Sequence, residues 1–377
     1  MINFNIPPYY GNELKYIQRA IDNNMICGDG EFVGKCHEWF QNKTGSAKVL
    51  MTSSCTHATE MAAILCGFGP GDEAIMPSFT YPSTADAFVL RGSTPVFIDI
   101  HPETMNMNED LIEAAITDKT KAIVPVHYAG VACDMDKILE IAEKHKLYVI
   151  EDAAQCVMAE YKGKALGSMG DFGCYSFHET KNFSMGCGGA LLMKDIKWLS
   201  ASEIVWDVGT NRGDFQRGTV DKYMWVDVGS SYFPSDLNCA YLYSQLEAAE
   251  EITVWRMKAW EQYNNELKPL EVEGKITLPF IPEDRKHNAH MFYIKCSDPE
   301  ERAHLIDYLG ENEIKAVFHY IPLHSAPAGK KFGRFVGDDI YTTKESERLL
   351  RLPLYYGISE DDVMKVCDCI KKFYLKK

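Results

Sequence analysis

The chain has 377 residues, of which 46% are hydrophobic and 25% are charged, a balance typical of a globular protein with a large apolar core. This length exceeds what one hydrophobic core usually supports, so we expect a large domain with a smaller one attached. The formal net charge of -15 at pH 7 argues against nucleic-acid binding, and an anionic substrate would need a local group of cations.

Neither a membrane span nor an export signal is expected. No apolar stretch approaches the roughly 20 residues that a membrane helix requires, and the first residues lack a basic segment followed by an apolar one. The twelve cysteines are dispersed and form no C-x-x-C pair, which predicts reduced thiols in a cytoplasmic protein. Cys367 and Cys369 could form half of a metal site, but no cluster of further ligands lies nearby, so we expect no metal.

In chain order, short apolar runs alternate with segments of helical period, which is the pattern of a sheet covered by helices on both faces. Seven runs predict strands, at residues 47–51, 73–77, 95–100, 121–128, 147–152, 172–177 and 189–193. Between them, apolar residues recur at helical spacing, at residues 56–68, 83–92, 108–116 and 134–145. We therefore predict an α/β domain with a mostly parallel, seven-stranded sheet.

The second half of the chain predicts a different arrangement. Residues 238–267 have helical period without proline or glycine, which predicts one long helix linking two domains. Strand-like runs follow at 290–296 and 314–321 with helices between them, typical of a smaller α+β domain. We place the large domain at residues 1–245, of which the segment 1–35 could pack with the small domain, and the linking helix and small domain at 246–377.

Polar residues follow the predicted strands, and open α/β sheets bind ligands at the carboxyl ends of their strands. Ser54, Cys55 and Thr56 follow the first strand, where a helix N-terminus could hold a phosphate or the hydroxyl groups could simply cap the helix. Tyr81 follows the second strand and could cover a flat ring or belong to the core. Asp152 ends the fifth strand, where a buried acid needs a partner or acts as a cap.

Ser176 and Lys181 follow the sixth strand, just before a glycine-rich turn. A lone lysine in a loop is usually a solvated surface charge. Pyridoxal phosphate, however, needs a lysine for a Schiff base, an acid at the pyridine nitrogen, a phosphate cup and a stacking aromatic ring. No single element is specific, but together they predict this cofactor, with a lysine that moves protons at the substrate carbon.

Four segments carry a resemblance to a known family: PSFTYPSTADAFVLRG at 77–92, AIVPVHYAGVACDMD at 122–136, VIEDAAQ at 149–155 and SFHETKN at 176–182. In this order and spacing they resemble the sugar aminotransferases of the DegT/DnrJ/EryC1/StrS family. The similarity covers nearly the whole chain. It implies a fold-type-I pyridoxal-phosphate-dependent transferase with a large sheet domain and a smaller C-terminal domain.

The resemblance also implies roles for single residues. Lys181 would form the Schiff base and Asp152 would pair with the pyridine nitrogen. Gln155 would lie by the ring hydroxyl, and Tyr81 would stack on the ring. Ser231 of a neighbouring subunit would reach the phosphate, at the place where relatives carry the Asn of a Gly-Tyr-Asn segment, which implies a homodimer with shared active sites. The residues expected to bind the phosphate within the same chain are Ser54, Cys55, Thr56 and Ser176.

Two positions depart from the family pattern. Cys187 stands in the turn 186–189 where relatives have a glutamate, which puts any interaction of that carboxylate in doubt. Phe233 and Pro234 stand where relatives often carry Arg-Met, so substrate contacts in that loop cannot be transferred. Neither change affects the expected cofactor residues.

Within the family, the segments FNIPPYYGNELKYI at 4–17 and VFHYIPLHSAPAG at 317–329 are similar to members that convert dTDP-4-dehydro-6-deoxyglucose to dTDP-4-amino-4,6-dideoxygalactose. This implies glutamate as the amino donor. Basic residues that could bind the dTDP diphosphate, or simply belong to a solvated loop, are Arg212, Arg217 and Lys222. Residues that could close over the sugar, or simply pack in a domain interface, are His319, Tyr320 and His324.

Other functions remain open at this point. A sugar dehydratase of the same family has a histidine in place of the lysine, so Lys181 argues against that reaction. A lysine-based aldolase would need no phosphate cup and no acid at a pyridine nitrogen. A regulatory binding protein of the same fold would have no reason to keep the complete cofactor set. Amination of another nucleotide-linked keto sugar, at C3 or with other stereochemistry at C4, is the nearest alternative.

Overall fold

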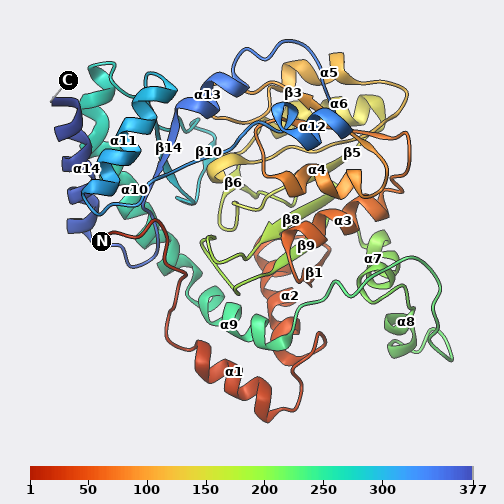
Figure 1. Cartoon of the computed structure of the whole chain (residues 1–377). Coiled ribbons are helices and arrows are strands. Elements are labelled where there is room, and N and C mark those ends of the chain that lie inside the picture. Colours follow the sequence, from red (N-terminus) through yellow and green to blue (C-terminus); the bar gives the residue numbers. More distant parts are fainter. Residues whose placement is uncertain (376–377) are drawn as a thin grey trace.

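The computed structural model describes residues 1–375, whose largest unit is an eight-stranded sheet (Figure 1). In spatial order the strands are β1 (Lys48–Thr52), β9 (Gly189–Met193), β8 (Phe172–Ser176), β5 (Tyr148–Asp152), β4 (Thr120–Ile123), β2 (Glu73–Pro77), β3 (Thr94–Ile98) and β13 (Arg334–Phe335). Neighbouring strands are parallel except at β9, which runs antiparallel to β1 and β8. The predicted mostly parallel α/β sheet is confirmed.

The sheet has one more strand than predicted. Seven of its strands coincide with the seven apolar runs, whereas β13 comes from the second half of the chain and pairs in parallel with β3. The guanidinium of Arg334 in β13 donates to Glu73 of β2 at 2.8 Å. Because β13 is only two residues long and half polar, hydrophobic periodicity could not reveal it.

Helices surround the sheet and form the second lobe. The helices of the first two thirds are α1 (Glu13–Asp22), α2 (Glu31–Thr44), α3 (Cys55–Leu65), α4 (Pro82–Val89), α5 (Ile112–Ala115), α6 (Met135–His145), α7 (Leu199–Trp206), α8 (Arg212–Gln216) and α9 (Asp236–Glu247). The remaining helices are α10 (Ala249–Val272), α11 (Pro299–Glu311), α12 (Pro327–Phe332), α13 (Thr342–Arg348) and α14 (Glu360–Leu375). Short 3-10 turns occur at η1 (Glu109–Leu111), η2 (Tyr128–Gly130), η3 (Ile196–Trp198) and η4 (Leu323–Ser325).

Side-chain alternation along the strands gives the sheet two apolar faces. In β1, Val49 and Met51 pack in one buried cluster and Leu50 packs in another. Residues of α2, α6 and α9 complete the first cluster, and residues of α3, α4 and α7 complete the second. Burial on both faces explains why the strands read as continuous apolar runs in the sequence.

The predicted long helix is two helices. Ala248 has φ -106° and ψ 17°, outside the helical region, and separates α9 from α10. Both halves keep helical period, so the sequence pattern does not show the break. The longer helix, α10, packs against α14, and its Trp260, Tyr263 and Leu267 lie in the apolar core of the second lobe.

The second lobe contains the antiparallel sheet of β11 (Phe292–Lys295), β14 (Leu349–Leu352) and β12 (Val317–Phe318). The N-terminus reaches this lobe, because Ile2 forms a bridge with Ile314, while α1 packs on α9. A third small sheet, of β10 (Arg285–Lys286), β6 (Glu160–Tyr161) and β7 (Lys164–Ala165), links the two lobes. Within residues 1–375, no helix is long and apolar enough to cross a membrane.

Candidate active site

The residues predicted to bind the cofactor meet at one edge of the large sheet. Asp152 is the last residue of β5 and Ser176 is the last residue of β8, and these strands are parallel neighbours. Parallel neighbours end at the same edge, which brings both side chains and the following Lys181 loop together. Ser53 and Ser54 follow β1, which runs in the same direction as β8 because both are antiparallel to β9.

Asp152 is held by hydroxyl and amide donors. Its side chain is buried, with the residue only 7% exposed, and its Oδ2 accepts a hydrogen bond from Thr84 Oγ1 at 2.6 Å. Its Oδ1 accepts from the backbone amide of Ala154 at 3.2 Å. Thr84 also shares a hydrogen bond with Thr80 at 2.8 Å, so the carboxylate orientation is fixed by α4. Thr84 was not predicted from the sequence, although a hydroxyl group in the first helical turn after Tyr81 could have indicated a site residue.

Lys181 lies in the loop between β8 and β9, where its backbone amide donates to the carbonyl of His178 at 2.9 Å. Within residues 1–375, its Nζ has no hydrogen bond and no ion pair. Burial lowers the pKa of Lys181, and the thiol of Cys55 and the carboxylate of Asp152 only partly oppose this. A lysine with a lowered pKa is more often neutral, as a nucleophilic amine must be.

The N-terminus of α3 forms a compact cup beside this loop. Ser54 is the N-cap, and its Oγ accepts from the amide of His57 at 3.0 Å. Ser176 is nearly buried, and its Oγ accepts only a long contact of 3.4 Å from the amide of His178. A Cβ on Gly189 would lie 2.4 Å from the backbone nitrogen of Cys55, so only glycine allows this approach of β9. Hydroxyl groups and free amides at a helix N-terminus suit a phosphate.

Gln155 and Tyr81 both approach Tyr320 of the second lobe. The Oε1 atom of Gln155 accepts from the amide of Ala129 at 2.6 Å, and its Nε2 donates to Tyr320 Oη at 3.4 Å. Tyr81 is 59% exposed, so its ring is free to cover a ligand. Its ring centroid lies 6.2 Å from that of Tyr320, which belongs to the second lobe.

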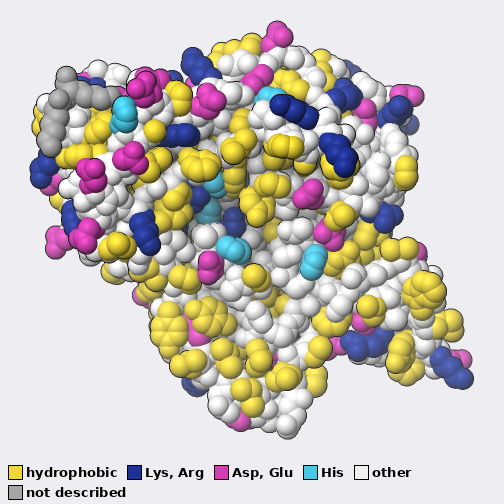
Figure 2. Space-filling model, viewed as in Figure 1, with side chains coloured by type: hydrophobic (Ala, Val, Ile, Leu, Met, Phe, Trp, Pro, Cys, Tyr) yellow, Lys and Arg dark blue, Asp and Glu magenta, His cyan; other side chains and the backbone are white. Residues whose placement is uncertain are grey.

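Three residues of the second lobe contact the sheet edge. His319 Nδ1 lies 3.1 Å from Tyr128 Oη, and burial lowers the pKa of His319, as do the charges of Arg351 and Lys181. Tyr320 contacts Gln155, as described above. His324 instead bonds Ser78 through Nδ1 at 2.7 Å and pairs with Asp339 through Nε2 at 3.2 Å. Figure 2 shows basic and histidine side chains set back in a hollow between the two lobes.

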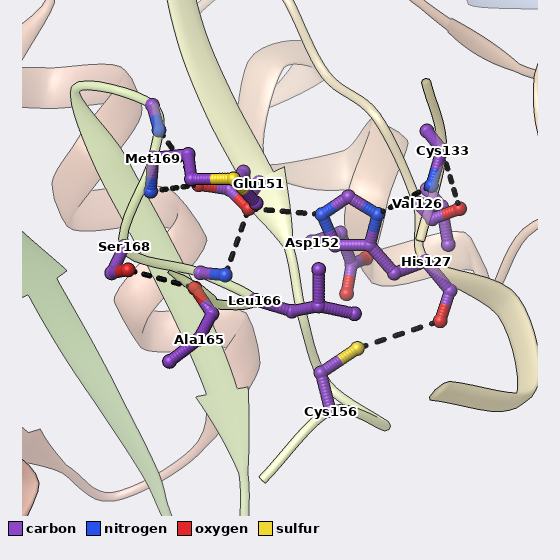
Figure 3. Close-up of polar contacts among 12 residues, drawn as sticks. Val126, His127, Cys133, Glu151, Asp152, Cys156, Ala165, Leu166, Ser168 and Met169 are labelled. Atoms are coloured by element: carbon purple, nitrogen blue, oxygen red, sulfur yellow. Dashed lines mark hydrogen bonds and ion pairs between the residues drawn. The ribbon is translucent and has the colours of Figure 1, made fainter. Parts of the chain in front are cut away.

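A buried hydrogen-bonded pair of side chains, not predicted from the sequence, lies behind Asp152. Glu151 Oε2 lies 2.9 Å from His127 Nε2, and both side chains have no exposed surface (Figure 3). His127 Nδ1 accepts the amide of Cys133 at 3.1 Å, which leaves Nε2 as the donor to Glu151. Glu151 also accepts backbone amides of a turn, those of Gly167, Met169 and Gly170. The pair thus joins the end of β5 to two loops.

A family model described as the DegT/DnrJ/EryC1/StrS aminotransferase family matches residues 9–371. The chain belongs to this family. SpsC of Bacillus subtilis, a spore coat polysaccharide biosynthesis protein, is 31% identical over 98% of this chain and 96% of its own length. A GDP-perosamine synthase of Caulobacter vibrioides is 32% identical over 96% of this chain and 95% of its own. Spr1654 of Streptococcus pneumoniae, solved in its PLP form, has a TM-score of 0.90 at 25% identity, covering 100% of this chain and 99% of that one.

Membership in the DegT/DnrJ/EryC1/StrS family confirms the predicted fold-type-I aminotransferase fold. The predicted cofactor, pyridoxal phosphate, is confirmed at the level of the family, because a solved relative was captured in that form. The narrower resemblance to enzymes of dTDP-4-amino-4,6-dideoxygalactose is not confirmed, because these relatives are named for a GDP-linked sugar and a spore coat polysaccharide.

Four of the predicted site residues do not lie at the sheet edge that carries Lys181 in a single chain. Arg212, Arg217 and Lys222 lie in or beside α8, which stands apart from the sheet (Figure 1). The two arginines pair with acidic residues, namely Asp29, Asp207, Glu203 and Asp214. Ser231 is exposed and forms a backbone bridge with Asp207. Their roles stay predictions that require a second copy of the chain.

Proposed function

We propose that this protein transfers an amino group from glutamate to the 4-keto carbon of a nucleotide-linked 4-keto-6-deoxy sugar. One observation carries the proposal: an unpaired lysine with a lowered pKa and a buried, orientated carboxylate share one sheet edge beside a helix N-terminus. Family membership supports the reaction type, and the relatives' names support a sugar substrate destined for surface polysaccharide.

The residues present fit pyridoxal phosphate. Asp152 presents a buried acceptor suited to a protonated pyridine nitrogen, and Ser54 and Ser176 offer hydroxyl groups suited to a phosphate. Gln155 would donate to the ring hydroxyl and Tyr81 would cover one face of the ring. When bound, the cofactor supplies an electron sink that stabilises negative charge at the substrate carbon.

Lys181 performs the proton transfers in this proposal. In each half-reaction its neutral amine would remove a proton from one carbon and the resulting ammonium would deliver a proton to another. The proton leaves the donor's α-carbon in the first half-reaction and reaches the sugar's C4 in the second. Burial lowers the pKa of Lys181, which favours the neutral amine that removes the proton. Asp152 would accept a hydrogen bond from the protonated pyridine nitrogen and so favour that form, and Thr84 holds that carboxylate in place.

The sugar nucleotide has two candidates. The resemblance of residues 4–17 and 317–329 supports dTDP-4-dehydro-6-deoxyglucose, with dTDP-4-amino-4,6-dideoxygalactose as the product. The similarity to GDP-perosamine synthases over 96% of this chain favours a GDP-linked 4-keto sugar instead. Both share the 4-keto carbon and differ in the nucleotide, so the Lys181 chemistry is the same for each.

The proposal is tested by reconstituting the protein with pyridoxal phosphate and following the visible absorption of the bound cofactor. Glutamate should bleach the band, and addition of the keto-sugar nucleotide should restore it and yield an amino sugar. Comparing dTDP-4-dehydro-6-deoxyglucose with its GDP-linked counterpart decides the nucleotide. Lys181→Ala should lack the band, whereas Lys164→Ala, which changes an exposed lysine of β7, should behave like the unmodified protein. A band that glutamate leaves unchanged would refute transamination.

A further inference from the structure

One basic residue at the active-site hollow has no assigned role. Arg351 lies on β14, between β11 and β12, where it is paired in register with Tyr293 and Val317. Directly paired residues project to the same face of a sheet, and the ring of Tyr293 lies 5.8 Å from that of Tyr128, which also contacts Tyr320. Arg351 therefore lies on the face of the second lobe that meets the sheet edge, and its charge contributes to the lowered pKa of Lys181. It was not predicted from the sequence, because an arginine alternating with leucines reads as the solvent face of an ordinary strand.

The guanidinium of Arg351 is unpaired. Its Nε is buried and has no hydrogen-bond partner, and within residues 1–375 no acid forms an ion pair with it. Its charge instead lies over the ring of Phe4, with 4.6 Å from the guanidinium carbon to the ring centroid. Stacking on a ring face leaves the in-plane N–H groups free for an anion.

Other buried cations of this protein do have partners. Lys295 pairs with Glu345 at 2.9 Å, and Arg256 donates to three backbone carbonyls. An unpaired buried cation is costly, so an anion is expected to bind Arg351 in the working enzyme.

We propose that Arg351 binds the α-carboxylate of the amino donor. The inference rests on the proposed function and deepens it by naming the residue that recognises the amino-acid substrate. An α-carboxylate is attached directly to the carbon that exchanges its proton with Lys181, so a cation close to that lysine is well placed to bind it. Arg351 presents a planar fork of donors that matches a carboxylate in bidentate geometry.

Two other anions fit less well. The cofactor phosphate has its cup at Ser54 and Ser176. Arg351 instead lies on the face of Tyr293, which leads through Tyr128 and Tyr320 to Gln155. The diphosphate of a sugar nucleotide is attached at C1, across the hexose ring from the 4-keto carbon that must meet Lys181. The donor carboxylate is therefore the anion whose position agrees with that of Arg351.

The two half-reactions should depend on Arg351 to different extents. Around its 4-keto carbon the sugar carries only neutral hydroxyl groups, so it gains little from a guanidinium at this place. Loss of Arg351 should therefore impair amination of the cofactor by glutamate and leave transfer from the pyridoxamine form to the sugar nearly unchanged.

The test uses the reconstituted holoenzyme and three variants: Arg351→Met, Arg351→Lys and, as a matched control, Arg348→Met. Arg348 ends α13, three residues away, and already donates to Thr277. The glutamate concentration that half-saturates bleaching of the cofactor band is compared with that for 4-aminobutyrate, a donor without an α-carboxylate. Binding of glutarate, which cannot react, is measured separately by calorimetry.

We expect Arg351→Met to raise the half-saturating glutamate concentration about 10-fold to 100-fold, to weaken glutarate binding similarly and to leave 4-aminobutyrate unaffected. Arg351→Lys should restore part of the loss, and Arg348→Met should match the unmodified protein. Equal effects on glutamate and 4-aminobutyrate, unchanged glutamate saturation, or a selective loss of the sugar half-reaction would each overturn the assignment. Failure of the unmodified protein to respond to glutamate would instead reject the proposed function itself.

Discussion

At the scale of single residues, the site places two charged groups in opposite environments. Asp152 accepts hydrogen bonds from Thr84 and Ala154, which suits a carboxylate that must stay an acceptor. Lys181 has no such partner, and burial lowers its pKa. Two groups prepared for opposite proton roles at one sheet edge are typical of an acid–base site.

Asp152→Asn should reduce transamination by at least about 100-fold, because the amide cannot hold the proton of a pyridinium. The variant should fold normally and still bind the cofactor, since Thr84 can still donate to the amide oxygen, while the Ala154 amide loses its acceptor. Measuring kcat/KM together with the cofactor absorption checks this. As a control, Asp136→Asn changes an exposed acid that pairs with Lys162 and should retain full activity. Activity within a few-fold of normal in Asp152→Asn would contradict the role.

Glu151 gives a prediction about stability and pH. Burial alone would raise the pKa of Glu151, but hydrogen bonds from His127 and from the amides of Gly170 and Gly167 outweigh it and lower the pKa. A carboxyl group with a lowered pKa in the folded state stabilises the protein above its unfolded pKa of about 4.3, and this stability is lost as the pH falls further.

Glu151→Gln should therefore lower the free energy of unfolding by about 3 kcal/mol at pH 7, because one of the two oxygens that accept buried donors is replaced by an NH2 group and the charge is lost. The difference should shrink as the pH falls below about 4.3, because the unfolded chain then takes up a proton that the folded protein, with its lowered pKa, does not. Urea unfolding at several pH values measures both effects. Glu113→Gln, at a surface pair with Lys144, is the control and should change stability little. A pH-independent difference would show that the charge of Glu151 is unimportant.

At the scale of elements, the cup at the N-terminus of α3 depends on the close approach of β9. Gly189→Ala would force a Cβ to within 2.4 Å of the backbone of Ser54 and Cys55. We expect a loss of about 1–3 kcal/mol in stability and at least about a 10-fold loss in cofactor affinity. Gly34→Ala, in α2 where an added Cβ would lie in open space, should be neutral or stabilising. Calorimetric titration with pyridoxal phosphate measures the cofactor affinity of each variant. An unchanged affinity in Gly189→Ala would contradict the proposed cup.

The helices and strands also show which parts of the fold could be predicted from the sequence. Strands buried on both faces appear as apolar runs, so the seven main strands and the polar residues at their ends could be predicted. The break at Ala248 and the edge strand β13 depend on tertiary contacts, which hydrophobic period does not record. Thr84 was missed for the same reason, because its partner Asp152 comes from a distant part of the chain.

At the scale of the whole molecule, one exposed segment indicates an interface. Residues 223–228 include large apolar side chains that face solvent, among them Tyr223, Met224 and Trp225, the last 79% exposed. Contiguous apolar surface of this kind marks interaction sites. A second copy of the chain is the partner expected from the family resemblance, and Ser231 lies close by in the sequence.

We therefore predict a homodimer in solution. Trp225→Arg should raise its dissociation constant at least about 10-fold, because an aromatic side chain that the dimer would bury is replaced by a charge. Sedimentation over a range of concentrations measures the dissociation constant. Val272→Arg, at an exposed position at the end of α10, is the control and should leave the dimer intact. A monomeric unmodified protein, or a Trp225→Arg variant that dimerises normally, would contradict this interface.

The central claim is that Lys181 is the residue to which pyridoxal phosphate becomes attached. The most direct measurement is mass spectrometry of peptides after the holoenzyme is reduced with borohydride, which makes the attachment permanent. We predict that the peptide containing Lys181 carries the phosphopyridoxyl group. Attachment to a different lysine, or no attachment in a protein that binds the cofactor, would contradict the claim.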